Sequence, residues 1–411
     1  MRCLISCFGL LLALVSCQIP LFDDRPRWKQ NLRQDASVQV LDAADTVILD
    51  KPLEPGVYVT ALCFPDWANW REGDYRGAQA VLFRDSVKVL SVPAGDRPDA
   101  DRLRLWGGHL WTQQVQGGET LLLCDGEERI RYPGDERLRG FLVADGAVHT
   151  LEQHAGGEGC CYRINGVEVF SSAQGVVMGS LGDREWEGGA LMRDSTGVYY
   201  VYGIPFRQGE AQSWEYRVMR GAQTVKLIPA HAPEGWIYDI RVLDGTVWRC
   251  ERRDSSSQSL CLVKEDLYMK LDIGAGEQVR SAKLIPLQDG EMGIKGVSRM
   301  SADGMVWVRT QNGLQCSVPR PDIQAFYYSG GALSFVASLS NGLVSSLFSN
   351  QVSIPVEAGV YSLLGERCAH FRDGVFAAAL TNAGSEEHLL LVNQERIPFT
   401  FNGFFTSLWI E

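Results

Sequence analysis

A short hairpin pattern recurs along the chain and constrains the fold more than any other feature. It reads as a strand, a turn containing Asp-Gly or a related pair, and a second strand rich in aromatic and β-branched residues. Its clear copies are RVLDGTVWRC (Arg241 to Cys250), FLVADGAVHTL (Phe141 to Leu151), RMSADGMVWVRT (Arg299 to Thr310) and AHFRDGVFAAAL (Ala369 to Leu380). Glycine suits these turns because it adopts positive φ at little cost. The chain is therefore predicted to consist of repeated antiparallel hairpins.

A second type of hairpin, with a short polar turn, alternates with the first. Examples are LLLCDGEERI, CYRINGVEVF and LLLVNQERIPF. The combined order is strand A, glycine turn, strand B, loop, strand C, polar turn, strand D, and a loop to the next strand A. This unit is about 40 residues long, which is typical of a four-stranded propeller blade. The predicted fold class is all-β, a β-propeller.

The number of repeats predicts how the ring of blades is built. Strand B starts near residues 56, 108, 146, 197, 245, 304, 331 and 374, which favours eight blades. Seven blades is the alternative, because the unit near residue 330 is short. The first strand B lacks a strand A before it, and the last segment, GFFTSLWIE (Gly403 to Glu411), follows the final strand D as a strand A would. We expect this segment to pair into the first blade, since an open sheet edge promotes aggregation.

Several copies also resemble a bacterial propeller family with repeats of the V-Y-V-A-G and W-K-N-G type. The matching segments are GVYVTAL (Gly56 to Leu62), GVYYVYG (Gly197 to Gly203) and YRINGVEV (Tyr162 to Val169). The resemblance is degenerate and extends over nearly the whole mature chain. It implies the fold and carries no catalytic residues.

The N-terminus, MRCLISCFGLLLALVSCQ, has the pattern of an export signal. Arg2 precedes an apolar run from Leu4 to Val15, which is too short to span a membrane. The end of the run, Leu14-Val15-Ser16-Cys17, resembles the lipobox of Gram-negative bacterial lipoproteins. That resemblance implies removal of residues 1–16 and lipidation of Cys17, with an ordinary cleaved signal peptide as the alternative. Gln18 stands where Asp often marks inner-membrane retention, so we expect an outer-membrane protein facing either the periplasm or the cell surface.

The remaining chain is predicted to be a tether over residues 17–37, including the lipidated cysteine, and one propeller domain over residues 38–411. The segment VQVLDAADTVIL (Val38 to Leu49) is an extra hairpin or outer strand without an assigned place. The net charge of −11 argues against a nucleic-acid partner. Scattered histidines, and cysteines without a C-x-x-C pair, predict no cofactor and no metal site. Cys250 and Cys261 flank one loop and would be either a disulfide or two free thiols.

The longest connections all join strand B to strand C or strand D to strand A, so they share one face, which we call the loop-rich face. They are Cys63–Ala78, Val92–Asp101, Ser171–Glu187, Gly203–Ser213, Pro229–Gly235 and Ile273–Gly293. Loops on a rigid scaffold are where binding residues concentrate. Aromatic rings here would stack on sugars while polar groups bind their hydroxyls. The candidate ligand-binding residues are Asp66, Trp67, Trp70, Asp74, Tyr75, Asp183, Glu185, Trp186, His231 and Trp236.

Three functions fit these features. Binding of a glycan or an envelope protein through the loop-rich face is favoured, because no catalytic motif is evident. A glycoside hydrolase or lyase, with loop carboxylates as acid and base, is the second. A structural subunit of an envelope complex is the third. The loop aromatics also have a purely structural interpretation, in which they fold the loops back onto the blades.

Overall fold

The structure is a computed structural model, and residues 37–411 form one compact unit. It describes residues 39–40, 51–98, 103–133, 138–154, 157, 159–178, 190–208, 211–229, 236–252, 260–271, 273, 278–287, 290–299, 305–311, 313–319, 323–329, 332–338, 344–349, 352–354, 356, 360–364, 366–372 and 374–411. Cys17 and the predicted signal peptide lie outside these residues. Among the described residues, no helix is both long and apolar enough to cross a lipid bilayer.

The described strands form eight antiparallel sheets, numbered here in chain order. The first holds β36 (Gly403–Ile410), β2 (Val57–Cys63), β3 (Gln79–Arg84) and β4 (Val87–Pro93). The second holds β6 (Arg104–Trp106), β7 (His109–Gln116), β8 (Glu119–Cys124) and β9 (Glu127–Pro133), with the short β5 (Arg97–Pro98) and β1 (Gln39–Val40). The third holds β10 (Leu138–Ala144), β11 (Ala147–Gln153), β12 (Cys160–Ile164) and β13 (Val167–Ser172). The fourth holds β14 (Val176–Val177), β15 (Leu191–Asp194), β16 (Gly197–Gln208), β17 (Ala211–Arg220) and β18 (Gln223–Ile228).

The other four sheets follow the same antiparallel plan. The fifth holds β19 (Trp236–Leu243), β20 (Thr246–Arg252), β21 (Leu260–Lys264) and β22 (Leu267–Lys270). The sixth holds β23 (Gln278–Pro286), β24 (Met292–Arg299), β25 (Met305–Thr310) and β26 (Gly313–Pro319). The seventh holds β27 (Ile323–Ser329), β28 (Ala332–Ser338), β29 (Val344–Ser349) and β30 (Val352–Ile354). The eighth holds β31 (Tyr361–Ser362), β32 (Ala369–Arg372), β33 (Val375–Asn382), β34 (Glu387–Val392) and β35 (Glu395–Thr400).

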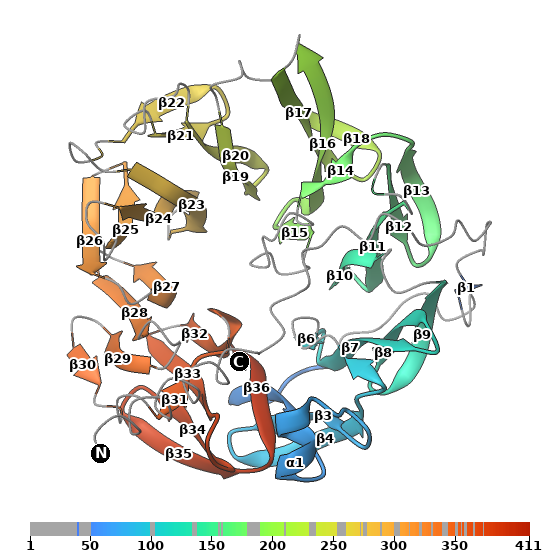
Figure 1. The fold of residues 1–411 in the computed structure, drawn as a ribbon, viewed down its shortest axis with the longest axis vertical. Helices are drawn as coiled ribbons and strands as arrows, with labels where there is room; N and C mark the ends of the chain where they lie inside the picture. The colour runs from blue at the N-terminus through green and yellow to red at the C-terminus, as the bar shows by residue number, and fades with distance from the viewer. Residues whose placement is uncertain are drawn as a thin grey trace, which may run out of the picture. The chain divides into compact units, whose positions relative to one another are not determined.

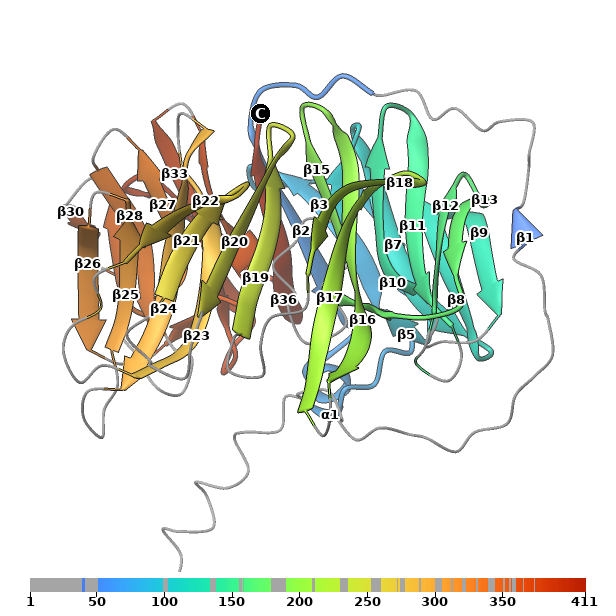
Figure 2. The same ribbon diagram turned by 90° about the horizontal axis from the view of Figure 1, so that it is seen from above.

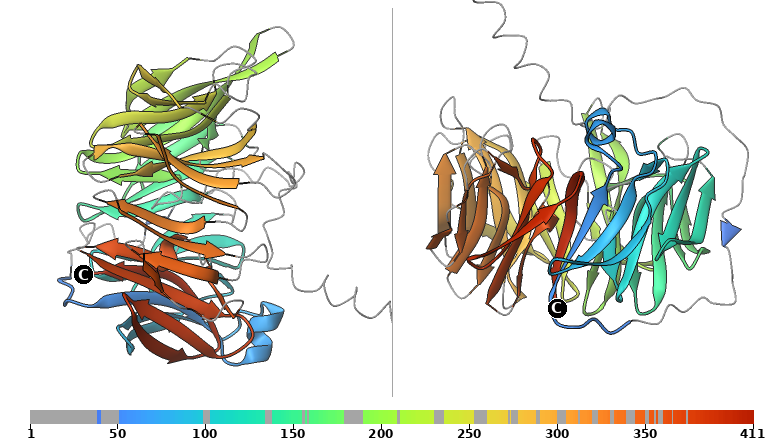
Figure 3. Two further views of the ribbon diagram at one scale, coloured as in Figure 1. Left: turned by 90° about the vertical axis from the view of Figure 1, so that its left-hand side faces the viewer. Right: turned by 90° about the horizontal axis from the view of Figure 1, so that it is seen from below.

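Within residues 37–411 the sheets follow one another around a common centre, with β6, β10, β15, β19, β23, β27, β32 and β36 innermost (Figure 1). The last strand, β36, pairs with β2 from Val57 opposite Ile410 to Cys63 opposite Gly403. Figure 3 shows these two ends of the unit, in red and blue, side by side. The first sheet is therefore built from both ends of the described unit.

Packing between neighbouring sheets explains the continuous apolar runs in the second strands. Every residue from Phe376 to Thr381 in β33 is buried, because both faces of its sheet are covered. On one side, Phe405 of β36 meets Phe399 at 5.3 Å between ring centroids. The third and fourth sheets meet in the same way, with Tyr162 stacked on Tyr200 at 4.8 Å. Such strands have no solvent face and so do not alternate apolar and polar residues.

One hydrogen-bonding device recurs at the turn between the third and fourth strands of five sheets. The first turn residue has positive φ. Its N–H donates to the carbonyl of one residue in the second strand, and its side-chain oxygen accepts the N–H of that second-strand residue. We call these residues turn clamps; they are Asp85 on Val57, Asp125 on Leu110, Asn165 on Val148, Glu265 on Val247 and Asn393 on Phe376. Asp and Asn tolerate this backbone conformation better than most residues. The clamps extend the pairing of second and third strands around the turn.

The strands of the sixth sheet differ from those that the repeat predicted. The sequence placed a first-to-second-strand hairpin at Arg299 to Thr310 and a loop at Ile273–Gly293. Both predictions are wrong: β23 and β24 are the first two strands, and Met305 at the start of β25 pairs with Ser298 of β24. Glycine in β24 hides the strand pattern. A Cβ at Gly296 would overlap the indole of Trp307, so this strand needs glycine where a β-branched residue would be expected.

Two further segments differ from, or complete, the sequence prediction. The predicted loop Gly203–Ser213 is instead a long hairpin, in which Gly203 pairs with Tyr216 and Gln208 with Ala211. Within the unassigned segment Val38–Leu49, the described residues Gln39 and Val40 form β1. They pair with Arg131 and Ile130 at the outer edge of β9.

Cys250 and Cys261 are both buried, and neither is part of a disulfide. Cys250 lies opposite Leu262, and Cys261 lies opposite Glu251 on the same pair of strands. Because adjacent strand residues point to opposite faces of a sheet, the two thiols lie on opposite faces. This register accounts for the absence of a disulfide between them.

Candidate ligand-binding site

The predicted aromatic loop after β2 contains a short helix, α1 (Trp67–Glu72). Asp66 is its N-cap and accepts the N–H of Asn69 at 2.9 Å, while Gly73 ends it with φ of 66°. In Figure 2, α1 lies at the opposite end of the strands from the C-terminus. The end of the strands that carries α1 is the loop-rich face. We call the opposite end, near the turns that follow β6 and β19, the turn face.

The aromatic residues of this loop are packed to different extents. Trp70 lies against Phe404 at 6.5 Å and against His388 at 6.0 Å, and Tyr75 lies against Phe64 at 5.4 Å. Trp67 contacts Trp70 edge-on at 4.8 Å, and both side chains are half-buried. Trp70 and Tyr75 therefore fold the loop onto the first sheet, and Trp67 is the more peripheral ring.

Two carboxylates of this loop, Asp66 and Asp74, have local partners. Asp74 accepts hydrogen bonds from Nε, Nη2 and the backbone N–H of Arg76, and these bonds lower its pKa. Asp66 serves as the helix cap. The predicted residues Asp183, Glu185, Trp186 and His231, and the side chain of Trp236, lie outside the described part of the structure.

A separate cavity of about 370 Å³ lies among the innermost strands, and we call it the axial cavity. Its wall includes the last residues of β19, from Arg241 to Leu243, and Ser407 to Trp409 near the end of β36. All of β6 also contributes, as does Pro286, the last residue of β23. The cavity therefore lies toward the turn face, away from the loops that the sequence favoured.

The polar lining of the axial cavity is strongly cationic. Four arginines contribute, from β6, β15, β19 and the 3₁₀ turn η4 (Glu366–Cys368): Arg104, Arg193, Arg241 and Arg367. His370 of β32 and Ser407 are the other polar side chains, and no Asp or Glu is among the described lining residues. Apolar walls come from Trp106, Leu105, Met192, Val242, Leu408 and Trp409.

Two carboxylates outside the lining contact cavity arginines. Asp239 is fully buried, contacts Arg241 at 3.3 Å, and accepts the N–H of Leu284 at 2.9 Å. Asp145 approaches Arg193 at 3.6 Å, and its side chain is 87% exposed. The contact with buried Asp239 holds the guanidinium of Arg241 in position. The contact with Asp145 is a surface contact that solvent weakens.

His370 of β32 and Trp409 of β36 form part of the cavity wall. Their rings stack at 5.1 Å between centroids with 26° between planes. Burial, with a further contribution from the charge of Arg372, lowers the pKa of His370. The imidazole is therefore neutral at neutral pH, and the positive charge of the cavity comes from arginines.

Sequence analysis missed this cavity, although one signal was present. Arg104 and Arg241 each stand three positions before a turn residue, Gly107 and Asp244, and His370 stands three positions before the Asp-Gly pair of the sequence AHFRDG. The innermost strands bring this register position to a common centre. This shared position could be recognised in the sequence only if the innermost strand of each hairpin were already known.

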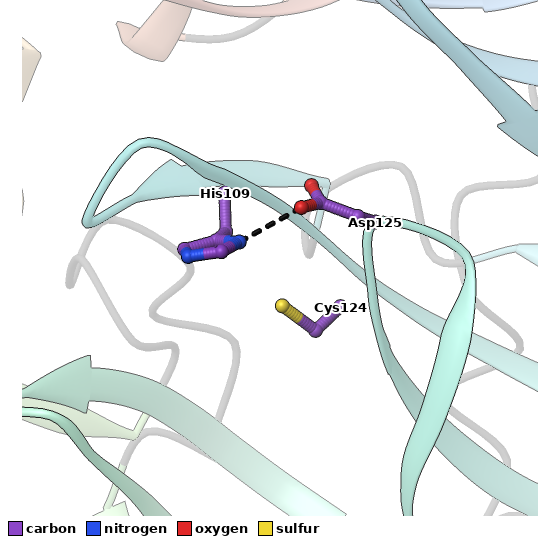
Figure 4. Close-up of side chains that lie close together, drawn as sticks. All are labelled: His109, Cys124 and Asp125. Atoms are coloured by element: carbon purple, nitrogen blue, oxygen red, sulfur yellow. Dashed lines mark hydrogen bonds and ion pairs between the residues drawn. The ribbon is translucent and has the colours of Figure 1, made fainter. Parts of the chain in front are cut away.

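A third cluster consists of His109, Cys124 and Asp125, shown in Figure 4, whose potential ligand atoms lie within 4.8 Å of one another. Asp125 already accepts from His109 Nδ1 at 2.8 Å, Lys51 Nζ at 2.6 Å and Leu110 N–H at 2.8 Å. Burial raises the pKa of Cys124 to about 11, so its thiol is protonated at neutral pH. A metal ion would have to displace that proton in order to bind the sulfur. Because Asp125 is a turn clamp, we assign this cluster to the fold.

Comparisons with known proteins define the fold and no closer relationship. No family model matches the chain, and no curated protein matches it. Among solved structures, dihydro-heme d1 dehydrogenase NirN in complex with DHE has a TM-score of 0.53 at 10% identity, covering 91% of this chain and 80% of that one. A eukaryotic initiation factor has a TM-score of 0.47 at 12% identity, covering 80% and 84% of the two chains. Aleuria aurantia lectin with α-methyl-L-fucoside has a TM-score of 0.27 at 9% identity, covering 61% and 90%.

The last two scores are too low to carry an argument. The likeness to NirN agrees with the repeated four-stranded antiparallel sheets. The chain is an all-β protein with a propeller-like fold, as the repeat predicted.

Proposed function

We propose that this protein is a lipid-anchored β-propeller that acts as a binding module of the bacterial envelope, with its ligand in the axial cavity. The eight sheets are its eight blades, and the pairing of β36 with β2 closes the ring. The lipobox supports an anchor at Cys17 and an outer-membrane location. Metabolic labelling with a fatty-acid analogue tests the anchor: the label should be incorporated into the chain and lost in Cys17→Ser.

The axial cavity is the observation that carries this proposal. Six of the eight sheets contribute to its wall, so the closed fold defines its shape. Its volume of about 370 Å³ lies within the range of small-molecule sites, and its mixture of indole rings and guanidiniums suits recognition. Glycoside cleavage needs two placed carboxyl groups, and the described lining residues include none. Binding is therefore the function that this site supports best.

The loop-rich face is the second candidate, since half-buried Trp67 lies beside Asp66 at the start of α1. A glycan or an envelope protein would bind there through the predicted loop residues. Catalysis by loop carboxylates, and a purely structural role in an envelope complex, are the remaining alternatives.

One experiment separates these functions. The full chain is screened on a glycan array, with reducing-end release monitored for every hit, and each hit is repeated with three variants. Leu105→Trp fills the axial cavity, Leu227→Trp adds the same bulk at a half-exposed position of outer strand β18, and Trp67→Ala alters the loop-rich face.

Axial binding predicts that Leu105→Trp alone abolishes the hits. Loss only in Trp67→Ala would move the site to the loop-rich face, and sugar release would establish an enzyme. If Leu105→Trp and Leu227→Trp melt alike and bind every hit alike, the axial site is refuted. An empty array would refute a glycan ligand.

A further inference from the structure

We propose that the ligand of the axial cavity is a small organic anion that carries carboxylate or phosphate groups. This inference rests on the proposed function, because it concerns the same cavity. It goes further by naming the chemistry of the ligand. The argument uses the charge of the wall, the geometry of its arginines and the apolar surface beside them.

The charge of the wall is opposite to that of the protein. The chain has 50 acidic and 39 basic residues, yet the described cavity lining holds four arginines and no acidic residue. These arginines come from four separate elements, β6, β15, β19 and η4. A concave site of one sign concentrates its field and raises the local concentration of opposite charge. An anion is the ligand that such a wall attracts.

Arginine has the geometry to bind an anion while keeping a partner in the protein. A guanidinium carries five N–H donors, and a carboxylate occupies at most two of them in a bidentate contact. Arg241 contacts the buried Asp239, which holds it in position. Arg193 donates to the carbonyl of Val143 at 3.4 Å, and its side chain is 42% exposed. The proposal therefore needs no unpaired guanidinium.

The apolar part of the wall indicates an organic ligand. The rings of Trp106 and Trp409 lie on the wall together with Leu105, Val242 and Leu408. Burying a hydrocarbon or sugar face against such residues adds affinity that an inorganic ion cannot gain. Acidic groups on the arginines and an apolar face on the indoles would satisfy both parts of the wall.

Isothermal titration calorimetry of the full chain tests the charge requirement. Glucose 1-phosphate, glucuronate and citrate are the acidic probes, and glucose is the neutral control. We expect the acidic probes to bind at low salt and glucose to show no heat. Binding should weaken at about 150 mM salt, because ions screen the attraction between accessible charges.

Arg193→Gln is the test variant, since the ion pair of Arg193 is with an exposed carboxylate and its loss leaves no buried charge. Arg220→Gln is the matched control: Arg220 is exposed on β17 of the same sheet and is not part of the cavity wall. Removing one charged hydrogen-bond donor should weaken acidic probes about tenfold in Arg193→Gln, with little change in Arg220→Gln. Equal melting temperatures of the two variants verify that both are folded.

The outcomes separate this inference from the proposed function. If glucose binds as well as its phosphate and Leu105→Trp abolishes both, axial binding stands and the anion inference fails. If acidic probes bind but weaken equally in the two arginine variants, the anion site is elsewhere and the inference fails. Heat from none of the acidic probes at low salt also overturns it, and axial binding is then judged by the Leu105→Trp screen alone.

The acidic group could belong to a free metabolite or to the end of an envelope glycan. If the free probes bind as tightly as acidic glycans on the array, the source is a small metabolite. Markedly tighter binding of the acidic glycans identifies an envelope glycan. Either result supports the anion class.

Discussion

His388, which packs against Trp70 of α1, is expected to make the free energy of unfolding depend on pH. It lies in β34 and is 2% exposed. Its Nδ1 accepts the N–H of Asn382 at 3.0 Å, and its Nε2 donates to the carbonyl of Phe401 at 2.9 Å. The neutral ring satisfies both contacts. A proton added to Nδ1 would face another N–H donor, so the folded state disfavours protonation.

The size of the effect follows from the pKa. Burial lowers the pKa of His388 from 6.5 to about 4. Between these values the unfolded chain binds a proton that the folded chain does not, so stability falls as pH falls. The contribution is fully present above about pH 6.5 and is lost progressively toward pH 4. At about 1.4 kcal/mol for each pKa unit, acidification to pH 4 removes about 3 kcal/mol.

Urea unfolding followed by tryptophan fluorescence at several pH values measures this loss, with His388→Gln as the comparison. Burial also lowers the pKa of His149 and His370, so wild-type stability falls with acid for more than one reason. Only the difference between wild type and His388→Gln reports His388. The reasoning is refuted if both proteins lose the same free energy between pH 7 and pH 4, or if an NMR titration finds the His388 pKa above 6.

Three other perturbations test the fold. Asn165→Ala removes the bond to the Val148 N–H and places alanine at a φ of 47°; we expect a loss of about 2 to 3 kcal/mol in urea unfolding. Asn165→Asp keeps both features, so an equal loss would contradict the turn clamp. Deleting residues 403–411 removes β36 from β2 and should abolish the cooperative transition in calorimetry, whereas unchanged melting would refute closure. Trp70→Ala removes packing on Phe404 and His388 and should cost about 2 kcal/mol, clearly more than Trp67→Ala; thermal midpoints that fall equally would count against the packing of Trp70.

The sequence predicted the hairpins correctly where turn chemistry and strand composition agree. Asp125 and Asn165 precede glycine at turns that need positive φ, and the flanking runs are apolar. The sixth sheet defeats the same reasoning. Gly296 makes room for Trp307 at the cost of strand propensity in β24, and Arg280 and Lys283 make β23 look polar. Errors in strand assignment therefore arise where packing overrides local preference.

Function was harder to predict because the sequence does not show which residues surround the centre of a ring. The aromatic loop at Trp67 and Trp70 stands out locally, yet Trp70 packs onto the first sheet. The arginines of the axial cavity are ordinary strand residues in the sequence, spread from Arg104 to Arg367. Only the pairing of strands and the packing of sheets bring them to one cavity.

The proposed closure of the ring and the proposed binding site involve the same strand, β36. Ser407, Leu408 and Trp409 line the axial cavity, while Ser407 and Leu408 also pair with Thr60 and Val59 of β2. The side chain of Ser407 lies 2.6 Å from the hydroxyl of Thr60, so the hydrogen bonds of the seam hold one side of the cavity wall. A ligand that binds only the closed ring must stabilise it, because binding to the folded state alone shifts the folding equilibrium. Weakening the β36–β2 pairing should therefore reduce affinity even when every arginine remains.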